Sequence, residues 1–258
     1  MTTTPPAVLV IAGLDPSGGA GLVADIQTLT ALDAHPAAVA TTLTVQDTRN
    51  AYEVRALDAD FVVAQARAVM TDMPIAAVKL GLLGSAATGE AVAALLNELP
   101  DVAVVLDPVL VASGGASLAE DALVDTMRHA LLPRATLATP NRREFVRLAD
   151  RGHDDAGRAE ALLARGCANI LLTGGDDDTA SVRNTLYSAS ARPQQFEWPR
   201  LAGPFHGSGC TLAAAAAAGL AHGMTVPVAV VAAQKFTYRA LQSAQPLGRG
   251  QPIPNRMP

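Results

Sequence analysis

The residues best suited to chemistry stand near the end of the chain, in the run His206-Gly-Ser-Gly-Cys210. The Ala-rich stretch Thr211–Ala221 follows and predicts a helix, whose first turn leaves backbone N–H groups without partners. Two glycines before that turn let a ligand approach these N–H groups closely, and the helix dipole favours a negative charge there. The sequence therefore predicts an anion-binding site at residues 207–210.

Phosphoryl transfer is a reaction that such a site would serve. The amides of Gly207, Ser208, Gly209 and Cys210 would stabilise the equatorial oxygens of a phosphoryl group without a lysine. Cys210 would face the attacking hydroxyl and, because a helix N-terminus lowers the pKa of a thiol, would act as a base or orient the alcohol. The structural alternative is a small buried cysteine that caps the helix. His206 is expected to pack against the loop or hydrogen-bond to it.

A second glycine-rich segment lies at the other end of the chain, between an apolar run and a helical pattern. Four glycines fall within Gly13–Gly21, and Asp25 follows on the predicted helix. The spacing matches neither the Rossmann pattern nor a P-loop, since no Gly-Lys-Ser/Thr follows. Ligands of open α/β sheets bind at the carboxyl ends of strands, so the position favours a binding loop. The alternative is a tight turn with glycines required only by its geometry.

Three polar residues follow buried runs farther along the chain. Asp107 ends one predicted strand, and Asn141 and Glu144 open the helix after another. All three could reach one solvated face, where hard oxygen ligands suit Mg²⁺, held directly or through water. Asn141 and Glu144 also have the spacing of a helix capping box, and both interpretations can hold at once.

Short apolar runs alternate with amphipathic stretches throughout the chain, as in βαβ units. Because the runs are apolar on both faces, they indicate a parallel sheet covered by helices on each side. A small antiparallel hairpin is expected at Thr185–Ser190 and Gln195–Trp198, joined across Pro193. The predicted strands are Val8–Ala12, Ala37–Thr44, Ala76–Leu82, Val102–Leu106, Leu137–Thr139 and Ile170–Thr173. The predicted helices are Gly21–Leu32, Ala59–Thr71, Thr88–Leu99, Glu120–Leu131, Arg142–Ala149 and Ala156–Arg165.

Composition limits the class of protein. With 258 residues, half of them hydrophobic, the chain can bury a sizeable core, and no break in composition divides the range 1–258 into two domains. Residues 1–6 and about 246–258 are expected to be loop or flexible. The formal net charge is −5 and the lysines are Lys79 and Lys235, which argues against a nucleic-acid partner. No signal peptide or membrane span is predicted, and Cys167 and Cys210 are expected as separate thiols in a cytoplasmic protein.

Six segments and the single residue Asp25, in this order, resemble the hydroxymethylpyrimidine/phosphomethylpyrimidine kinases of thiamine biosynthesis, a branch of the ribokinase-like superfamily. The resemblance covers nearly the whole chain and implies a three-layer αβα sandwich with a central, mainly parallel sheet, use of ATP and Mg²⁺, and a homodimer. The segments are Ala12-Gly-Leu-Asp-Pro-Ser-Gly-Gly-Ala-Gly21 with Asp25, Thr44-Val-Gln-Asp-Thr48, Lys79-Leu-Gly-Leu-Leu83, Leu106-Asp-Pro-Val109, Thr139-Pro-Asn-Arg-Arg-Glu144 and His206-Gly-Ser-Gly-Cys210.

The resemblance also implies roles for individual residues. Gly13 and Asp25 would contact the pyrimidine, and Gln46 would pair with its aminopyrimidine edge, because a carboxamide offers a donor beside an acceptor. Leu82 and Val109 would form an apolar wall against the ring, or serve only in the core. Residues placed near the ATP phosphates and the metal are Asn141, Glu144, Thr173 and Ser208.

One departure from the family pattern concerns the phosphates. Many members have Lys-Gly-Gly-His where this chain has Thr173-Gly-Gly-Asp176, so one phosphate-binding cation is missing. Mg²⁺, the helix N-terminus and Arg142 or Arg143 would have to neutralise the charge. Cys210 itself agrees with the pyrimidine-kinase branch, because other members of the superfamily usually have aspartate there.

The leading prediction is an ATP-dependent kinase that phosphorylates the hydroxymethyl group of hydroxymethylpyrimidine and then its monophosphate. A pyridoxal kinase is the enzymatic alternative, since pyridoxal also has a hydroxymethyl group on an aromatic heterocycle. A pyrimidine-binding sensor without activity is a third, motivated by Thr173 and by the scarcity of lysine. Turnover with both alcohols, and ATP consumption that depends on them, separates the three.

Overall fold

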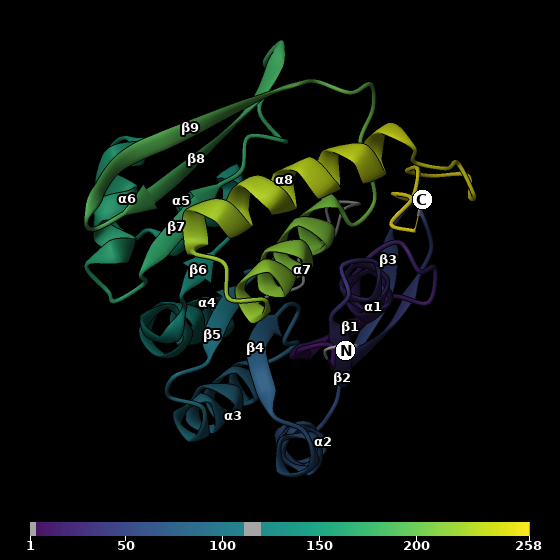
Figure 1. Cartoon of the computed structure of the whole chain (residues 1–258), viewed down its shortest axis with the longest axis vertical. Coiled ribbons are helices and arrows are strands. Elements are labelled where there is room, and N and C mark those ends of the chain that lie inside the picture. Colours follow the sequence, from purple (N-terminus) through teal and green to yellow (C-terminus); the bar gives the residue numbers. More distant parts are fainter. Residues whose placement is uncertain (1–3, 111–119, 258) are drawn as a thin grey trace.

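The computed structural model describes residues 4–110 and 120–257, which form a nine-stranded sheet covered by helices (Figure 1). The strand order is β3-β2-β1-β4-β5-β6-β7-β8-β9, and the strands from β2 to β7 in this order are parallel. The strands are β1 (Ala7–Leu14), β2 (His35–Gln46), β3 (Ala51–Ala56), β4 (Ile75–Leu80), β5 (Ala103–Leu106), β6 (Leu137–Ala138), β7 (Asn169–Leu172), β8 (Ser181–Ser188) and β9 (Ala191–Pro199).

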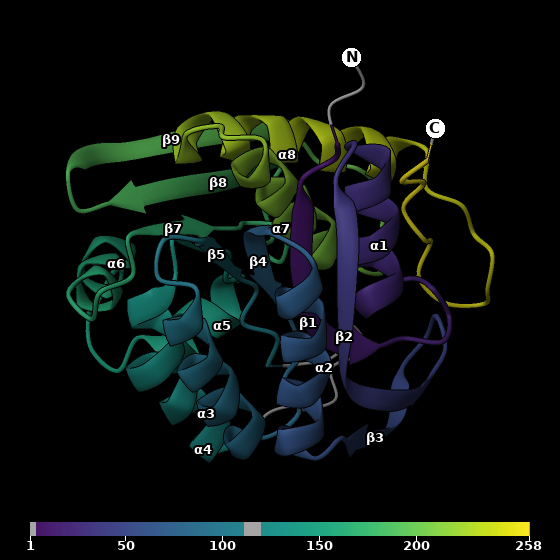
Figure 2. The ribbon, with the colours of Figure 1, turned by 60° about the horizontal axis from the view of Figure 1, so that its bottom comes forward.

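Helices cover both faces of the sheet, and each face has its own apolar core (Figure 2). One layer contains α1 (Gly21–Ala31), α7 (Ser208–Ala221) and α8 (Val226–Gln242). The other contains α2 (Ala59–Asp72), α3 (Ala86–Leu95), α4 (Asp121–Thr126), α5 (Arg142–Leu148) and α6 (Asp155–Leu163), with short helical turns at Leu96–Glu98, Met127–Leu131 and Leu132–Arg134. The predicted αβα sandwich with a mainly parallel sheet is confirmed.

The antiparallel strands at the two edges differ from expectation. β3 was not predicted, although it pairs with β2 along its length. The predicted hairpin exists as β8 and β9, but it is longer and continues the main sheet beyond β7. Pro193 lies within edge strand β9, where the pairing shifts between Leu186 and Ser188, and not in the turn. An edge strand tolerates proline at such a shift because no ladder hydrogen bond is needed there.

The last part of the chain also departs from expectation. Helix α8 was not predicted, yet its first turn contains Pro227, which is a common helix-start signal, and it buries Val230, Ala233 and Phe236. The tail after α8 is loop, as predicted, but residues 244–257 are held in place: Gln245 and Ile253 form a bridge, and Arg256 is 1% exposed. Residues 1–3, part of the predicted flexible start, and Pro258 lie outside the described residues. Within the described residues, none of the helices has the length and apolarity needed to span a bilayer.

Candidate active site

A cavity of about 550 Å³ opens at the carboxyl ends of the parallel strands, between them and the first turn of α7. This is the expected ligand-binding edge of an open α/β sheet. The structure brings twelve of the predicted site residues together in its wall: Gly13, Gln46, Leu82, Asp107, Val109, Asn141, Glu144, Thr173, Gly207, Ser208, Gly209 and Cys210. Asp25 is the predicted site residue that does not line it.

The two glycine-rich loops meet directly at one side of this cavity. Gly207 caps α7 with φ 77°, a left-handed conformation that disfavours other residues. A side chain at Gly207 would collide with the carbonyl oxygen of Gly19, and a side chain at Gly19 would collide with the ring of His206. Glycine is therefore required at both positions because two backbones approach closely, and the mouth of α7 faces the N-terminal glycine loop.

His206 lies between Asp15 of the N-terminal glycine loop and Gln46. Its Nε2 lies 2.7 Å from Asp15 Oδ2 and 3.2 Å from Gln46 Nε2. Asp15 also accepts hydrogen bonds from the amides of Ser17 and Ala20, both at 2.8 Å. Burial opposes the charge on Asp15, but the contacts with His206 and Ser17 keep the pKa of its carboxyl below the ordinary value. Because an ionised carboxylate only accepts, His206 Nε2 donates to Asp15, and the amide of Gln46 lies beside this pair at the cavity wall. This hydrogen bond of His206 is therefore with the N-terminal glycine loop and not with residues 207–210.

A buried ion pair lies beneath the cavity, and the sequence did not indicate it. Lys79 Nζ is 2.9 Å from Asp25 Oδ2 and 3.7 Å from Asp107 Oδ2, and neither Lys79 nor Asp25 has exposed surface. Burial alone would lower the pKa of Lys79, but the negative charges of Asp25 and Asp107 raise it above its ordinary value. Burial raises the pKa of Asp25 to about 6, although Lys79 opposes the shift.

Lys79, and not Asp25, therefore reaches the cavity, so the predicted direct contact between Asp25 and a substrate is corrected. Asp25 sits on the buried face of α1, where it balances the charge of the lysine. A signal was available in the sequence: Lys79 is one of two lysines and falls within an otherwise apolar strand. A lysine in such a strand requires a buried carboxylate as its partner.

Cys210 is half-buried at the start of α7 and lines the cavity. Burial raises the pKa of its thiol to about 12; Lys79 lowers it, Asp107 and Asp25 raise it further, and the amide of Gly21 lowers it. The expectation of a lowered thiol pKa is thus wrong for the ligand-free protein, because desolvation outweighs the helix N-terminus. The thiol is neutral before ligands bind.

Asn141 and Glu144 form the predicted capping box at the start of α5. Asn141 Oδ1 accepts a hydrogen bond from the Glu144 amide at 3.0 Å, and Glu144 Oε2 accepts one from the Asn141 amide at 2.9 Å. Glu144 is 5% exposed, and burial, followed by the charge of Asp107, raises its pKa to about 8. The cap and the cavity wall are therefore made by the same two residues.

Asp107 and Glu144 place two carboxyl groups in the cavity wall where Mg²⁺ could bind. Asp107 Oδ2 is buried and accepts no hydrogen bond, and the charge of Asp107 contributes to the raised pKa of Glu144. Carboxylate oxygens of this kind suit Mg²⁺, which keeps several waters and is usually shared with phosphates. In the described part of the chain, no group of three or more His, Cys, Asp or Glu side chains forms a complete metal site. The two carboxylates fit a metal that phosphates and water also ligate.

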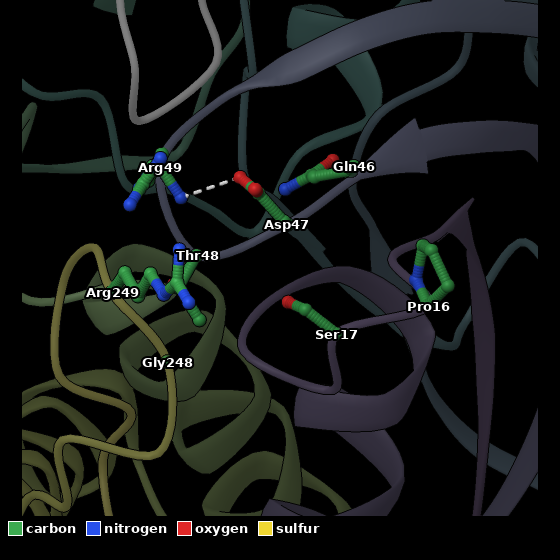
Figure 3. Close-up of a pocket in the computed structure, with 8 residues that line it drawn as sticks. All are labelled: Pro16, Ser17, Gln46, Asp47, Thr48, Arg49, Gly248 and Arg249. Atoms are coloured by element: carbon green, nitrogen blue, oxygen red, sulfur yellow. Dashed lines mark hydrogen bonds between the residues drawn. The ribbon is translucent and has the colours of Figure 1, made fainter.

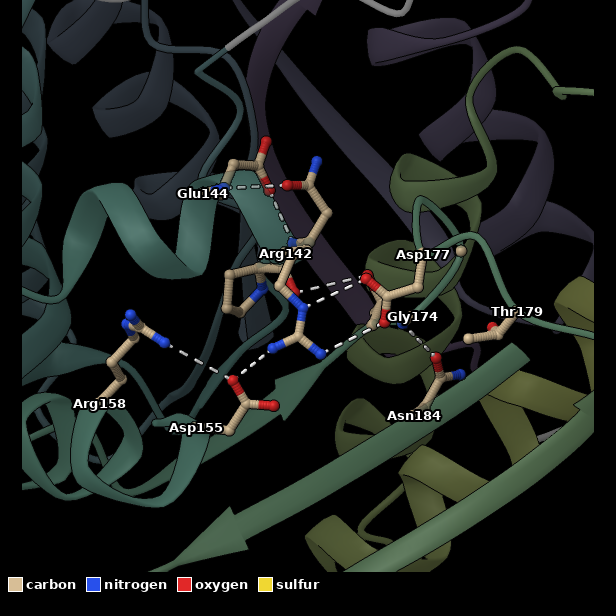
Figure 4. A network of polar contacts seen from close by, with 12 residues as sticks. Arg142, Glu144, Asp155, Arg158, Gly174, Asp177, Thr179 and Asn184 are labelled. Atoms are coloured by element: carbon tan, nitrogen blue, oxygen red, sulfur yellow. Dashed lines mark hydrogen bonds and ion pairs between the residues drawn. The ribbon is translucent and has the colours of Figure 1, made fainter. Parts of the chain in front are cut away.

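The two candidate phosphate-binding arginines have different surroundings. Arg142 is bound to Asp155 and, at 3.2 Å, to Asp177 (Figure 4), so it holds α5, α6 and the loop after β7 together. It does not line the cavity, which corrects its predicted role. Arg143 is exposed and lines the cavity. Thr173 also lies in the wall, and its amide donates to the carbonyl oxygen of Pro140 at 3.0 Å.

Arg200 is a further cavity residue that sequence reasoning missed. Its guanidinium donates hydrogen bonds to the carbonyl oxygens of Gly175, Asp177 and Thr179, at 2.9, 2.7 and 2.6 Å. The amide of Gly174 in the same loop donates to Asn184 Oδ1 at 3.0 Å. The loop in which the family's lysine is missing is thus ordered by an arginine from the end of β9.

A mainly parallel sheet between two helical layers, with a helix N-terminus and buried carboxylates around a cavity at the ends of its strands, fits a phosphotransferase of the ribokinase-like fold. Comparison with known families narrows this class. The sequence model of the phosphomethylpyrimidine kinase family matches residues 15–255, so the chain belongs to that family.

Individual relatives agree with this assignment. The hydroxymethylpyrimidine/phosphomethylpyrimidine kinase of Streptomyces coelicolor is 40% identical over 252 residues, which cover 96% of this chain and 93% of that protein. The thiamine biosynthesis bifunctional protein ThiED of Geobacter sulfurreducens is also 40% identical, but the chain spans about half of its length, 51%. Pyridoxal kinase from Staphylococcus aureus, solved with AMP-PCP and pyridoxal, superimposes with a TM-score of 0.89 at 26% identity, over 99% of this chain and 94% of that one.

The raised pKa of Glu144 gives a prediction for pH-dependent stability. Between the unfolded value of 4.5 and the folded value of about 8, unfolding releases the proton that folded Glu144 retains. The free energy of unfolding therefore falls as pH rises through this range. Glu144→Gln removes this fall while leaving an acceptor for the Asn141 amide, so its Tm relative to the unmodified protein should rise from pH 5 to pH 8.

Thermal unfolding from pH 5 to pH 9, in chelator and without nucleotide, measures the effect. Glu160→Gln on the exposed face of α6 is the control and should give a difference that does not change with pH. Parallel Tm curves for Glu144→Gln and the unmodified protein would contradict the prediction.

Proposed function

We propose that this protein transfers the terminal phosphoryl group of ATP to the hydroxymethyl group of hydroxymethylpyrimidine, and then phosphorylates the monophosphate, in thiamine biosynthesis. One observation supports this above the others. The N-terminus of α7, with Cys210 in its first turn, opens into the same cavity as Gln46 and the N-terminal glycine loop. A phosphate donor and a heterocyclic alcohol can meet there. The names of the relatives from Streptomyces coelicolor and Geobacter sulfurreducens support the substrate.

The substrate end of the cavity suits an aminopyrimidine. Gln46, which lies beside His206, offers a carboxamide donor and acceptor to the edge of the ring. Leu82 and Val109 contribute apolar surface for its faces. Gly13 packs closely between Thr42 and Leu82, because a Cβ at that position would lie 2.3 Å from Thr42 Oγ1 and 3.1 Å from Leu82 Cδ2. Ring binding therefore depends on one oriented amide between apolar walls.

The reaction end holds the alcohol against the transferred group. The amides of Gly207–Cys210 stabilise the phosphoryl oxygens, and Lys79 adds a positive charge at the cavity floor. Because the Cys210 thiol is neutral before ligands bind, it orients the alcohol by hydrogen bonding. An orienting group suffices in a loose phosphoryl-transfer transition state, in which the alcohol loses its proton late.

ATP is the proposed donor, since related kinases have been solved with AMP-PCP and with ADP. Asn141, Thr173 and Ser208 lie along the cavity where its phosphates would bind. Asp107 and Glu144 would hold Mg²⁺, directly or through water. When bound, Mg²⁺ neutralises charge that develops on the phosphates.

Pyridoxal is the competing acceptor, favoured by the likeness to pyridoxal kinase from Staphylococcus aureus. Initial rates with hydroxymethylpyrimidine and pyridoxal, at equal ATP and Mg²⁺, test both proposals. We expect a higher kcat/KM for the pyrimidine and formation of its diphosphate on longer incubation. A preference for pyridoxal would reverse the assignment, and binding without ATP consumption would indicate the sensor.

Substitution of Cys210 tests its place beside the alcohol. Cys210→Ala should lower kcat by roughly 10²–10⁴-fold, the usual contribution of a positioned proton-transfer group. Cys210→Asp should retain substantial activity, because a carboxylate at this position can also hold the alcohol. Rates at saturating substrates measure both, and Cys167→Ala, at a buried thiol away from the cavity, is the control. An unchanged kcat in Cys210→Ala would remove the proposed role.

Arg143 is the proposed replacement for the missing lysine. Arg143→Gln should raise KM for ATP several-fold and change kcat less, because the side chain is exposed and binds phosphates in both the ground and the transition state. Arg151→Gln removes an exposed arginine that does not line the cavity and should leave KM for ATP unchanged. Equal KM values in both variants would argue against a phosphate contact.

We also propose a cytoplasmic homodimer that pairs through the hairpin β2–β3. Leu43 and Val45 point to the same side of β2 and are 47% and 56% exposed. The unpaired thiols of Cys167 and Cys210 and the need for ATP support the cytoplasm. Val45→Asp should reduce the mass in solution, measured by light scattering, from dimer to monomer. Val228→Asp, an equally exposed position on α8, should not, and a monomeric unmodified protein would contradict the dimer.

A further inference from the structure

The C-terminal tail contributes a buried guanidinium to the place where the two glycine loops meet. Arg256 is 1% exposed and donates hydrogen bonds to Gly19 O at 2.5 Å, Gly18 O at 3.4 Å and Gln27 Oε1 at 3.1 Å. Its Nε donates to Thr211 Oγ1 at 2.9 Å. Within residues 4–110 and 120–257, no carboxylate lies within ion-pair distance of it.

Thr211 links Arg256 to the first turn of α7. Its hydroxyl donates to the carbonyl oxygen of Gly207 at 2.8 Å, while it accepts from Arg256. One planar group thus binds the carbonyls of the N-terminal glycine loop on one side and, through one hydroxyl, the first turn of α7 on the other. These are the two segments whose backbones are in contact at Gly19 and Gly207.

The rest of the tail is anchored without Arg256. The amides of Gly250 and Gln251 donate to Thr48 at 3.0 and 2.9 Å. Figure 3 shows the tail at Gly248 and Arg249 beside Thr48, close to Gln46 at the end of β2. The His206 amide donates to Pro252 O at 3.0 Å, and Ile253 is buried. Burying a guanidinium with no carboxylate in contact is unfavourable, although Asp25 and Asp15 lie near enough to favour its charge. Ile253 anchors the tail without that cost. Anchoring alone does not account for an arginine at this position.

We propose that Arg256 is a positioning residue for phosphoryl transfer: its guanidinium sets the distance between the N-terminal glycine loop and the N-terminus of α7. This inference rests on the proposed function, in which the alcohol and the phosphoryl group meet between these segments. Small displacements of reacting groups cost large factors in rate, so the effect falls on kcat. A lysine cannot reproduce it, because a single ammonium does not span the acceptors that the planar fork joins.

Variants of Arg256 and Thr211 test the inference. Arg256→Met keeps the volume and removes the donors, and Thr211→Val keeps the guanidinium and removes the hydroxyl between Arg256 and Gly207. Assayed well below their Tm, both should lower kcat, Arg256→Met at least tenfold, with KM for the pyrimidine and ATP within about threefold of the unmodified values. Arg256→Lys should recover little, and millimolar guanidinium should restore part of the rate of Arg256→Ala.

Binding of ADP with aluminium fluoride, in the presence of the pyrimidine, gives a second measurement. Its affinity should fall in proportion to kcat in Arg256→Met and Thr211→Val, while the affinity for ADP alone stays constant. Ile253→Ala, which loosens the tail but keeps the guanidinium, and Arg192→Gln, which removes an exposed arginine on β9, should lower neither.

The outcomes separate this inference from the proposed function. An unmodified protein that does not phosphorylate hydroxymethylpyrimidine contradicts the proposed function. An active unmodified protein, with kcat unchanged in folded Arg256→Met and Thr211→Val, overturns the inference alone. A loss of kcat in Ile253→Ala as large as in Arg256→Met would also overturn it, because anchoring of the tail would then explain the effect.

Discussion

The close approach of two backbones, at Gly19 and Gly207, is the constraint on which the rest of this molecule depends. Neither position has room for a Cβ, and the pairs His206–Asp15 and Arg256–Gly19 reinforce the contact between the first βα loop and the N-terminus of α7. Both loops start from strands or helices that are fixed by apolar cores, one on each face of the sheet. Because the cores hold β1 and α7 rigidly, the polar groups on the loops can face a ligand instead of supporting the fold.

The charges beneath this contact are incompletely balanced in the ligand-free protein. Lys79 faces both Asp25 and Asp107, and Glu144 adds a further carboxyl group nearby. Burial raises the pKa of each of these carboxyls, because desolvation of the ionised forms outweighs the ion pair at Asp25 and the backbone hydrogen bonds at Glu144. Groups in this condition gain most when a cation arrives. The same desolvation keeps Cys210 protonated, so the electrostatics of the site depend on what is bound there.

Much of this arrangement could be predicted from the sequence, and the exceptions have physical causes. The parallel strands and their helices follow from apolar runs and amphipathic periods. Of the twelve site residues in the cavity wall, those of the loop 207–210 and Asp107, Asn141 and Glu144 were expected from their places at strand and helix ends, and the others from the family resemblance. β3, with Tyr52 and Arg55 exposed, has no apolar period to reveal it. The pairing of Asp25 with Lys79 could be placed only once α1 was packed on β1 and β2, next to β4. The prediction of a lowered pKa for Cys210 was wrong, because the sequence shows that Cys210 begins a helix but does not show how deeply its thiol is buried.

Arginine takes several separate roles around a site in a chain that has two lysines. Arg142 ties α5 to α6 and the loop after β7, Arg200 orders residues 174–179 through their carbonyl oxygens, and Arg256 joins the two glycine loops. In each case a planar guanidinium binds several acceptors at fixed angles, which an ammonium group does not do. The loop Thr173-Gly-Gly-Asp176 therefore does not need its own cation to be ordered. A lysine in this loop would serve only to neutralise the charge of the phosphates, because Arg200 already holds the loop in place.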